Sequence, residues 1–493
     1  MKSLREILAG VSEVGSEFSS LEIEKVTPDS RKVSSGSVFV AYSGVEVDGH
    51  NFIDQAIDKG AAAIVGEKAS FAKEVEGKGI PYFLVDNGRL AWAKMVANLC
   101  DNPEKKLTII GITGTDGKTT TTNLIYQMLL KAKLNVAMVS TIKAVIAGKE
   151  FDTGLHTSSP DPDILWEWLS QIVKAGQTHV VLETTSHGLA QYRFGDIKFD
   201  VGVLTNLAHD HLEFHKTIQA YRDAKAMLFA NSLVSVINSR SKESAFFQSK
   251  AAAKLVRYDI NKDIRNVSYV EEDGVFWQEF EIKIFDKWIK TRSRLLGEYN
   301  LENILAASKA ADEVGVEGEK IILAIQDFEQ LPGRFQSVVN TKGIHTIVDF
   351  AHTEQGLSSV ISLVKNHLRK EDEKIIVVFG CNGGRDQTKR APMGRVACNL
   401  ADMTVVTTED PRKEDVNQIY LQIEQGCLES GGVLGKTLFR EDDRSKAIDM
   451  AINILARKGD WVLFLGKGHE KSMNIDGVET PWDEVLVVKD KLL

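Results

Sequence analysis

One segment constrains the fold of this chain more than any other: a glycine-punctuated turn between an apolar run and a helix-compatible stretch. The apolar run 107–112 leads into Gly-Thr-Asp-Gly-Lys-Thr at 114–119, and the helix pattern extends to about residue 132. Glycines let backbone N–H groups surround phosphate oxygens, while Lys118 can reach terminal phosphates and the Thr119 hydroxyl can bind Mg²⁺. A full P-loop would need glycine where Ile112 stands. This shortened P-loop predicts a nucleoside triphosphate site.

The composition fits a large enzyme rather than a nucleic-acid or membrane binder. With 493 residues, the chain is long enough for about three domains. Its net charge of −9 predicts no general affinity for nucleic acid or an anionic membrane, so we interpret basic residues as local clamps for anionic substrates. The four cysteines form no CxxC pair, and no signal-peptide core or long apolar span is present. We expect a cytoplasmic protein without a membrane segment, and a monomer.

Breaks in the pattern divide the chain into three expected domains, 1–104, 105–332 and 333–493. The second alternates strand and helix signals, which predicts an α/β fold with a P-loop-type, mostly parallel sheet. Residues 276–296 interrupt that rhythm with alternating apolar and charged side chains, which predicts a small antiparallel appendage. Expected strands lie at 107–112, 136–140, 180–183, 201–204, 346–348, 375–379, 404–406 and 461–465.

The third domain is predicted to be Rossmann-like, with a site at one edge of its sheet. Its apolar strands are followed directly by Asp349, Gly380, Asp410 and Lys467. Because open parallel sheets place their sites at the carboxyl ends of the strands, these four loops should converge on one crevice. The alternative is that these loops are simply polar.

The central domain carries groups that could bind a metal. Glu183 stands at a strand end, and the segment 206–215 holds three histidines and two acidic residues after the next strand. No zinc-site spacing such as HExxH occurs there, and Mg²⁺ on nucleotide phosphates needs few protein ligands, so Mg²⁺ is favoured over zinc. Lys225 lies on a partly apolar helix stripe over 220–229, where a lysine usually snorkels to solvent.

The order of these strings resembles the Mur ligase family over the whole chain. The members of that family join an amino acid to a carboxylate through an acyl phosphate made with ATP. Further motifs are similar to those of the member that adds a diamino acid to a UDP-linked muramyl dipeptide. The shared motifs are Gly114-Thr-Asp-Gly-Lys-Thr119, Glu183-Thr-Thr-Ser-His187, Asp210-His-Leu212, Tyr221-x-x-Ala-Lys225, Asn300-x-x-Asn303, Gly333-Arg-Phe335, Asp349-Phe-Ala-His352, Arg385-Asp386 and Gly466-Lys-Gly-His-Glu470.

The resemblance implies a role for each matching residue. The catalytic residues would be Lys118, Glu183, His211 and Lys225. The Mg²⁺ ligands would be Thr119, Glu183, His211 and Lys225. Lys225 would be carbamylated, which requires a neutral amine and is favoured by burial. ATP would contact Gly114, Thr115, Asp116, Gly117, Lys118, Thr119, Thr120, Asn303, Arg334 and Asp349. The substrates would contact Ser30 and His50 (uridine diphosphate), Ser158, Ser159, Ser186, Gln191 and Arg193 (muramyl peptide), and Arg385, Asp410, Arg412, Gly466 and Glu470 (amino acid).

The chain departs from the family pattern without losing a charged catalytic group. Asp116 replaces the usual asparagine, Ser158-Ser159 replace paired threonines, and Glu354 stands where proline is common. We therefore expect the activity to be retained. Either His211 or Glu183 could assist deprotonation of the incoming amine.

The amino acid added is predicted to be meso-diaminopimelate, with L-lysine as the alternative. Arg412 would bind a distal carboxylate that lysine lacks, and Glu470 would hold the distal ammonium. Asp410 stands where asparagine is usual, and its extra negative charge would favour lysine. More distant alternatives are a folylpolyglutamate synthetase-like ligase, which would not need the uridine-binding first domain, and a regulatory nucleotide switch, which would not need Lys225.

Overall fold

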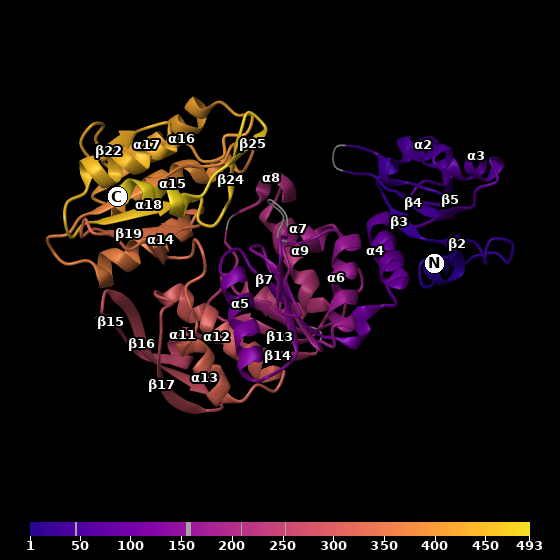
Figure 1. The fold of residues 1–493 in the computed structure, drawn as a ribbon, viewed down its shortest axis with the longest axis horizontal. Helices are drawn as coiled ribbons and strands as arrows, with labels where there is room; N and C mark the ends of the chain where they lie inside the picture. The colour runs from indigo at the N-terminus through magenta and orange to yellow at the C-terminus, as the bar shows by residue number, and fades with distance from the viewer. Residues whose placement is uncertain (45–46, 154–158, 209, 252) are drawn as a thin grey trace.

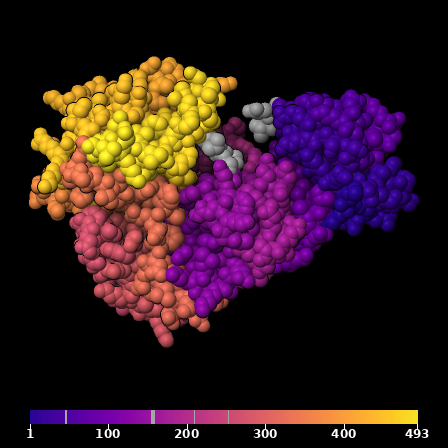
Figure 2. All heavy atoms as spheres, viewed as in Figure 1, coloured from indigo at the N-terminus to yellow at the C-terminus, as the bar shows by residue number. Residues whose placement is uncertain are grey.

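The computed structural model describes residues 1–44, 47–153, 159–208, 210–251 and 253–493. The chain is built on four larger sheets, which follow one another along the sequence (Figure 1). In Figure 2, the N-terminal part (indigo) lies to the right of the central part (magenta), and the C-terminal part (orange to yellow) lies at the upper left. No helix in these ranges is both long and apolar enough to cross a membrane.

The N-terminal part holds a four-stranded parallel sheet of order β3-β4-β5-β6. Alternate residues of β4 face opposite cores: Val38 packs towards α4, whereas Phe39 packs towards α2 and α3. Helix α4 also packs on α6 of the central part, so the two parts share one apolar cluster. The elements are β1 (Lys2–Ser3), α1 (Leu4–Ile7), β2 (Glu22–Ile23), β3 (Lys25–Thr27), β4 (Ser37–Ala41), α2 (Ile53–Asp58), β5 (Ala61–Gly66), α3 (Ala72–Gly77), β6 (Tyr82–Leu84) and α4 (Gly88–Leu99).

The central part is organised around an eight-stranded sheet of order β10-β9-β8-β11-β7-β12-β13-β14, in which the β8–β9 and β9–β10 pairs are antiparallel and the other pairs are parallel. Its middle strand β7 sends Ile109 towards α6 and α9 and Ile110 towards α5, α12 and α13. The elements are β7 (Thr108–Thr113), α5 (Lys118–Lys131), β8 (Val136–Val139), β9 (Ala144–Ile146), β10 (Lys149–Phe151), α6 (Pro162–Lys174), β11 (His179–Glu183), α7 (Ser186–Ala190), β12 (Phe199–Leu204), α8 (Leu212–His215), α9 (Ile218–Ala230), β13 (Ser232–Asn238), α10 (Ser244–Lys250), β14 (Lys254–Tyr258), α11 (Ile260–Asp263), α12 (Glu298–Glu313) and α13 (Gly318–Gln326).

The interruption expected at 276–296 is a three-stranded antiparallel sheet of β15 (Ile264–Glu272), β16 (Val275–Ile284) and β17 (Lys287–Ser293). Its inward residues Phe280, Ile282 and Ile284 join the core under α12 and α13. The sequence did not predict β15, whose residues are mostly exposed and lack a clear alternation. At its other end the sheet reaches the C-terminal part, where Phe276 packs 5.5 Å from the Trp461 ring.

The C-terminal part holds a six-stranded sheet of order β18-β19-β23-β20-β21-β22, parallel except at the edge strand β18. Helices α14, α15 and α16 cover one face, and α17 and α18 cover the other. The elements are β18 (Gln336–Ser337), β19 (His345–Asp349), α14 (Glu354–Leu363), β20 (Ile375–Phe379), α15 (Arg390–Leu400), β21 (Met403–Val406), α16 (Val416–Glu429), β22 (Leu438–Arg440), α17 (Arg444–Asp449), β23 (Trp461–Leu465), β24 (Ser472–Ile475), β25 (Val478–Pro481) and α18 (Glu484–Leu492). The predicted α/β class with parallel-rich sheets is confirmed.

Candidate active site

The carboxyl-end edges of the central and C-terminal sheets border one cleft of about 420 Å³. The central part contributes the 115–120 loop, Glu183 and the 210–213 segment. The C-terminal part contributes Arg334 and loops that follow β19, β20, β21 and β23, as the sequence predicted for that edge. Of the predicted site residues, those lining the cleft are Thr115, Asp116, Gly117, Lys118, Thr119, Thr120, Glu183, His211, Arg334, Arg385, Arg412, Gly466 and Glu470.

The phosphate-binding loop has the expected strand–loop–helix geometry. It joins β7 to α5, and Gly117 at the helix start has a φ of +82°, which L side chains rarely adopt. A Cβ at Gly117 would also collide with Asn303 of α12. The first N–H groups of α5 have no partner within the helix, so they are available to phosphate oxygens. Lys118 Nζ folds back on the loop and donates to the carbonyls of Gly114 (3.1 Å) and Thr115 (2.7 Å).

Two of the expected magnesium ligands meet at the start of α5. Thr119 Oγ1 donates to Glu183 Oε2 at 3.0 Å, and Glu183 is 2% exposed at the end of β11. Thr141, which sequence reasoning missed, donates to the same carboxylate from its backbone N (3.0 Å) and its Oγ1 (2.6 Å). Its place just after β8 was the available signal, because functional groups gather behind parallel strands. A carboxylate beside a hydroxyl at a phosphate loop fits Mg²⁺, a hard cation that prefers oxygen ligands.

Lys225 is buried rather than snorkelling. It lies on α9, is 1% exposed, and donates from Nζ to the Gly114 carbonyl at 2.6 Å. Its ammonium also sits 4.4 Å from the centre of the Tyr221 ring. Burial, and then the nearby charge of Lys118, hold the pKa of Lys225 well below its usual value. The expectation from the helix pattern alone, that this lysine reaches solvent, was therefore wrong. This face of α9 packs under the phosphate loop and does not lie at the surface.

His211 stands between two carboxylates at the start of α8. Its Nε2 lies 3.4 Å from Asp210 Oδ2, and its Nδ1 lies 3.6 Å from Glu213 Oε1. The backbone at His211 has a φ of +57°, an unusual value for a residue other than glycine. His209 lies outside the described residues. Within those residues, no cluster of three or more His, Cys, Asp or Glu side chains could hold a metal alone.

Of the three residues expected to contact adenosine or its phosphates, Arg334 lines the cleft, whereas Asn303 and Asp349 do not. Asn303 is buried behind Gly117, where its Oδ1 accepts from Thr121 Oγ1 at 3.3 Å. Asp349 ends β19 and accepts from two backbone amides, at 2.6 and 2.7 Å. Burial raises the pKa of Asp349, although the neighbouring Arg334 opposes this shift. Arg334 lines the cleft, and its buried Nε has no hydrogen-bond partner among the described residues.

The residues expected to bind uridine diphosphate lie apart from this cleft, in the N-terminal part. Ser30 Oγ donates to Gln55 Oε1 at 2.7 Å. His50 is 1% exposed, with Nδ1 2.6 Å from Asp48 Oδ1, and its Nε2 accepts from the Glu67 backbone N at 3.0 Å. The side chains of Ser30 and His50 are therefore both held by neighbours within this part.

The residues expected to bind the muramyl peptide gather around α7. Arg193 donates from Nε to Gln191 Oε1 (3.0 Å) and from NH1 to the Ser159 carbonyl (2.5 Å). Ser186 Oγ faces a different neighbour, His215 Nε2, at 3.0 Å. Ser158 lies outside the described residues. The structure thus brings Ser159, Gln191 and Arg193 together and places Ser186 beside His215.

The amino-acid pocket expected in the C-terminal part is strongly charged. The buried Lys467 Nζ donates to Asp410 Oδ1 at 3.0 Å and to Glu470 Oε2 at 2.6 Å, so the two carboxylates share one positive charge. The adjacent Glu409 is 2% exposed and lines the cleft, and its Oε2 has no partner among the described residues. Burial, partly offset by Arg444, raises the pKa of Glu409 to about 7.

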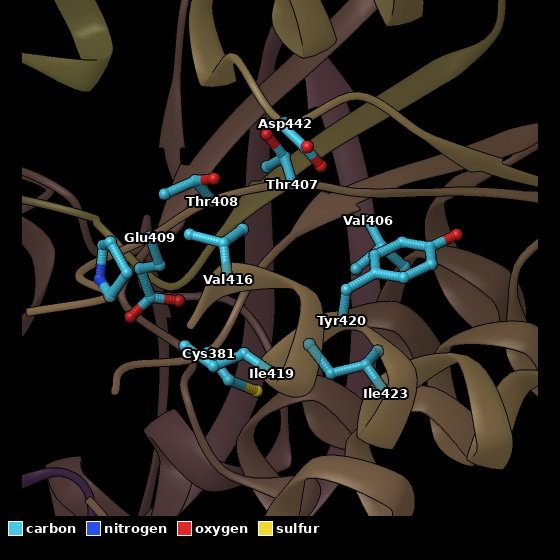
Figure 3. A pocket seen from close by; sticks show the side chains of 11 residues that line it. Cys381, Val406, Thr407, Thr408, Glu409, Val416, Ile419, Tyr420, Ile423 and Asp442 are labelled. Atoms are coloured by element: carbon cyan, nitrogen blue, oxygen red, sulfur yellow. The ribbon is translucent and has the colours of Figure 1, made fainter. Parts of the chain in front are cut away.

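The back of this pocket is closely packed. A small cavity of about 10 Å³ lies behind the loop that carries Glu409, and it is lined mostly by apolar side chains (Figure 3). In Figure 3, Glu409 stands at the edge of this cavity, across from Tyr420 of α16. The cavity is about the size of one water molecule, so a substrate must enter from the open cleft. Gly466 has a φ of +106°, and a Cβ there would collide with the Glu409 carboxylate.

Sequence comparisons match all three parts of the chain. Residues 22–98 match the Mur ligase family catalytic domain, residues 112–311 the Mur ligase middle domain, and residues 333–468 the Mur ligase glutamate ligase domain. The UDP-N-acetylmuramoyl-L-alanyl-D-glutamate--2,6-diaminopimelate ligase of Cytophaga hutchinsonii is 34% identical over 476 residues, which cover 96% of this chain and 95% of the relative. The protein of the same name from Geobacter metallireducens is 35% identical, with coverage of 96% and 94%.

The comparison with solved structures also finds proteins of the Mur ligase family. A UDP-N-acetylmuramoyl-L-alanyl-D-glutamate--2,6-diaminopimelate ligase superposes with a TM-score of 0.67 at 28% identity, and the match covers 100% of this chain and 99% of that one. Folylpolyglutamate synthase of Mycobacterium tuberculosis has a TM-score of 0.61 at 16% identity, which shows a shared fold alone. This chain belongs to the Mur ligase family. It is an ATP-dependent ligase, and ATP and Mg²⁺ are its cofactors.

Proposed function

We propose that this ligase adds meso-diaminopimelate to UDP-N-acetylmuramoyl-L-alanyl-D-glutamate during the synthesis of peptidoglycan precursors in the cytoplasm. The named relatives of similar length support this reaction. We assign residues 1–104 to the uridine-binding domain, 105–332 to the ATP-binding ligase domain and 333–493 to the amino-acid-binding domain, working as a monomer. The sheets described above support these limits, because each segment holds at least one sheet of its own.

One observation favours diaminopimelate over L-lysine. The buried side-chain atoms of the cleft that lack a partner among the described residues include two of opposite character on its amino-acid side, Arg412 Nε and Glu409 Oε2. Leaving such groups unpaired is costly, so a ligand with both a carboxylate and an ammonium at its distal end is the fitting occupant. Diaminopimelate has that end, whereas lysine offers only the ammonium. Lys467 contacts both Asp410 and Glu470, so it offsets only part of the negative charge that would favour lysine.

The ATP site determines the first half of the proposed reaction. ATP supplies the phosphoryl group that turns the substrate carboxylate into an acyl phosphate, and Mg²⁺ screens the charge of its phosphates. Lys118 and the first amides of α5 bind the phosphate oxygens, and Glu183 with Thr119 holds the cation. His211 and Glu183 remain the two candidates for taking the proton of the incoming amine. Closure of the C-terminal part over the cleft would exclude water, which would otherwise hydrolyse the acyl phosphate.

Lys225 is proposed to be carbamylated in the active enzyme. A neutral amine attacks the carbon of CO₂, an N–C bond forms and one proton is released, so a cationic side chain becomes a carboxylate. The burial and lowered pKa of Lys225 support the neutral amine that this step needs. As a carbamate, Lys225 would hold Mg²⁺ together with Glu183 and His211.

An ADP-release assay tests the proposed function directly. Purified protein, ATP, Mg²⁺ and the UDP-linked muramyl dipeptide are incubated with either meso-diaminopimelate or L-lysine. A further reaction contains a folate in place of the dipeptide, with glutamate as the amino acid. We expect the highest kcat/KM with diaminopimelate, and a loss of that preference in Arg412→Ala. A preference for lysine that Arg412→Ala leaves unchanged would refute the acceptor assignment, and release with none of the substrates would support a nucleotide switch instead.

A further inference from the structure

Acidic residues of the central part and basic residues of the C-terminal part face each other across the cleft. Glu213 Oε1 accepts from Arg385 NH1 at 3.0 Å, which joins α8 to the loop after β20. Asp210 Oδ1 lies 3.8 Å from Lys389 Nζ, and its Oδ2 lies 3.7 Å from His352 Nε2. All of these side chains line the cleft. The contacts therefore connect the ATP-binding and amino-acid-binding sides at the site itself.

We infer that Glu213 is a positioning residue that sets Arg385 for the carboxylate of the incoming amino acid. The inference rests on the proposed function, in which Arg385 binds the amino acid. Glu213 makes a single contact with one terminal nitrogen of the guanidinium. Because a guanidinium carries five N–H donors, its remaining edge stays available for a substrate carboxylate. Glu213 therefore orients Arg385 without occupying it.

The charges around Arg385 explain why it needs an anchor. Arg412 lies in the same cleft, and its pKa is lowered by burial and then by the charge of Arg385. Two guanidinium groups in one pocket repel each other, and an anion in contact with Arg385 holds it in place against this repulsion. Glu213 is that anion, because its Oε1 accepts from Arg385 NH1 at 3.0 Å.

The position of Glu213 also gives the contact a consequence for the order of events. Arg385 belongs to the C-terminal part and Glu213 to the central part, beside His211. Arg385 is thus correctly placed only when the two parts are together. Binding of the amino acid to an oriented Arg385 then favours the same closed arrangement that brings the ATP site and the amino acid together.

A double-mutant cycle on the full-length enzyme tests this inference. We expect Glu213→Gln to raise the KM for diaminopimelate about tenfold, the effect of losing one charge-assisted hydrogen bond, with the KM for ATP changed less than about twofold. In the Arg385→Ala background, the same substitution should change the KM for diaminopimelate less than about twofold, because Glu213 acts through Arg385. Glu298→Gln, which breaks the exposed Glu298–Arg240 pair, is the matched control and should behave as wild type.

Two outcomes would overturn the inference: an unchanged KM in Glu213→Gln, or effects of Glu213→Gln and Arg385→Ala that multiply independently. Hydrogen exchange separates this failure from a failure of the proposed function. If the wild-type protein forms no product with either diamino acid, the proposed function fails, and the positioning contact is still tested by exchange at amides 383–389. We expect faster exchange there in Glu213→Gln than in wild type, and equal exchange would refute the contact.

Discussion

Removing one partner of a buried ion pair should destabilise the C-terminal part far more than removing the same partner at the surface. Arg444 on α17 and Glu484 on α18 are 2% and 1% exposed, and Arg444 NH2 lies 2.6 Å from Glu484 Oε1. Arg444 also donates from Nε to both carboxylate oxygens and from NH2 to the Leu465 carbonyl. In Glu484→Gln the guanidinium stays buried without its counter-charge, which costs about 3–5 kcal/mol.

A surface pair of the same residue types provides the control. Arg395 NH2 and Glu429 Oε2 are also 2.6 Å apart, but their side chains are 46% and 45% exposed. Glu429→Gln should therefore cost only about 0–1 kcal/mol. In scanning calorimetry, a loss of about 3–5 kcal/mol corresponds to a midpoint about 6–20 °C lower for a unit of this size, against about 0–4 °C for the control. Equal shifts in the two variants would refute the argument that burial, and not ion-pair geometry, sets the cost.

Three further predictions concern the site. Lys118→Ala or Glu183→Ala should abolish ADP formation while the far-UV circular dichroism spectrum stays unchanged, and full turnover in either variant would contradict the assigned roles. Gly117→Ala should weaken ATP binding at least tenfold in equilibrium titration, because its positive φ and the contact with Asn303 leave no room for a Cβ, whereas wild-type affinity would contradict this geometry. Because burial raises the pKa of Glu409 to about 7, above the unfolded value of 4.5, its protonated form favours folding. As the pH rises from about 4.5 to 7, the free energy of unfolding of the ligand-free protein should fall. Glu409→Gln should flatten this part of the plot of unfolding free energy against pH, and an identical plot in the variant would count against the raised pKa.

Parts of the structure could be predicted from local sequence alone. The strand expected at 375–379 is β20 at Ile375–Phe379, and the strand expected at 461–465 is β23 at Trp461–Leu465. Both are continuous apolar runs buried on two faces, which is the strongest signal that a parallel strand gives. The strand β15 was missed because its exposed side chains carry no such signal. The site loops were predicted for a related reason, since functional groups follow the carboxyl ends of those strands.

The sequence by itself determined which chemical groups the site contains: the phosphate loop, the carboxylate of Glu183 and the arginines of the amino-acid pocket. Only the tertiary structure decided their charge states and pairings. Lys225 is buried under the phosphate loop, Lys467 pairs with Asp410 and Glu470, and Glu213 meets Arg385 from the other side of the cleft. The physical reason is that helix and strand periodicity are local, whereas burial and electrostatic pairing depend on residues that are distant in the chain and meet only when two sheets are placed edge to edge.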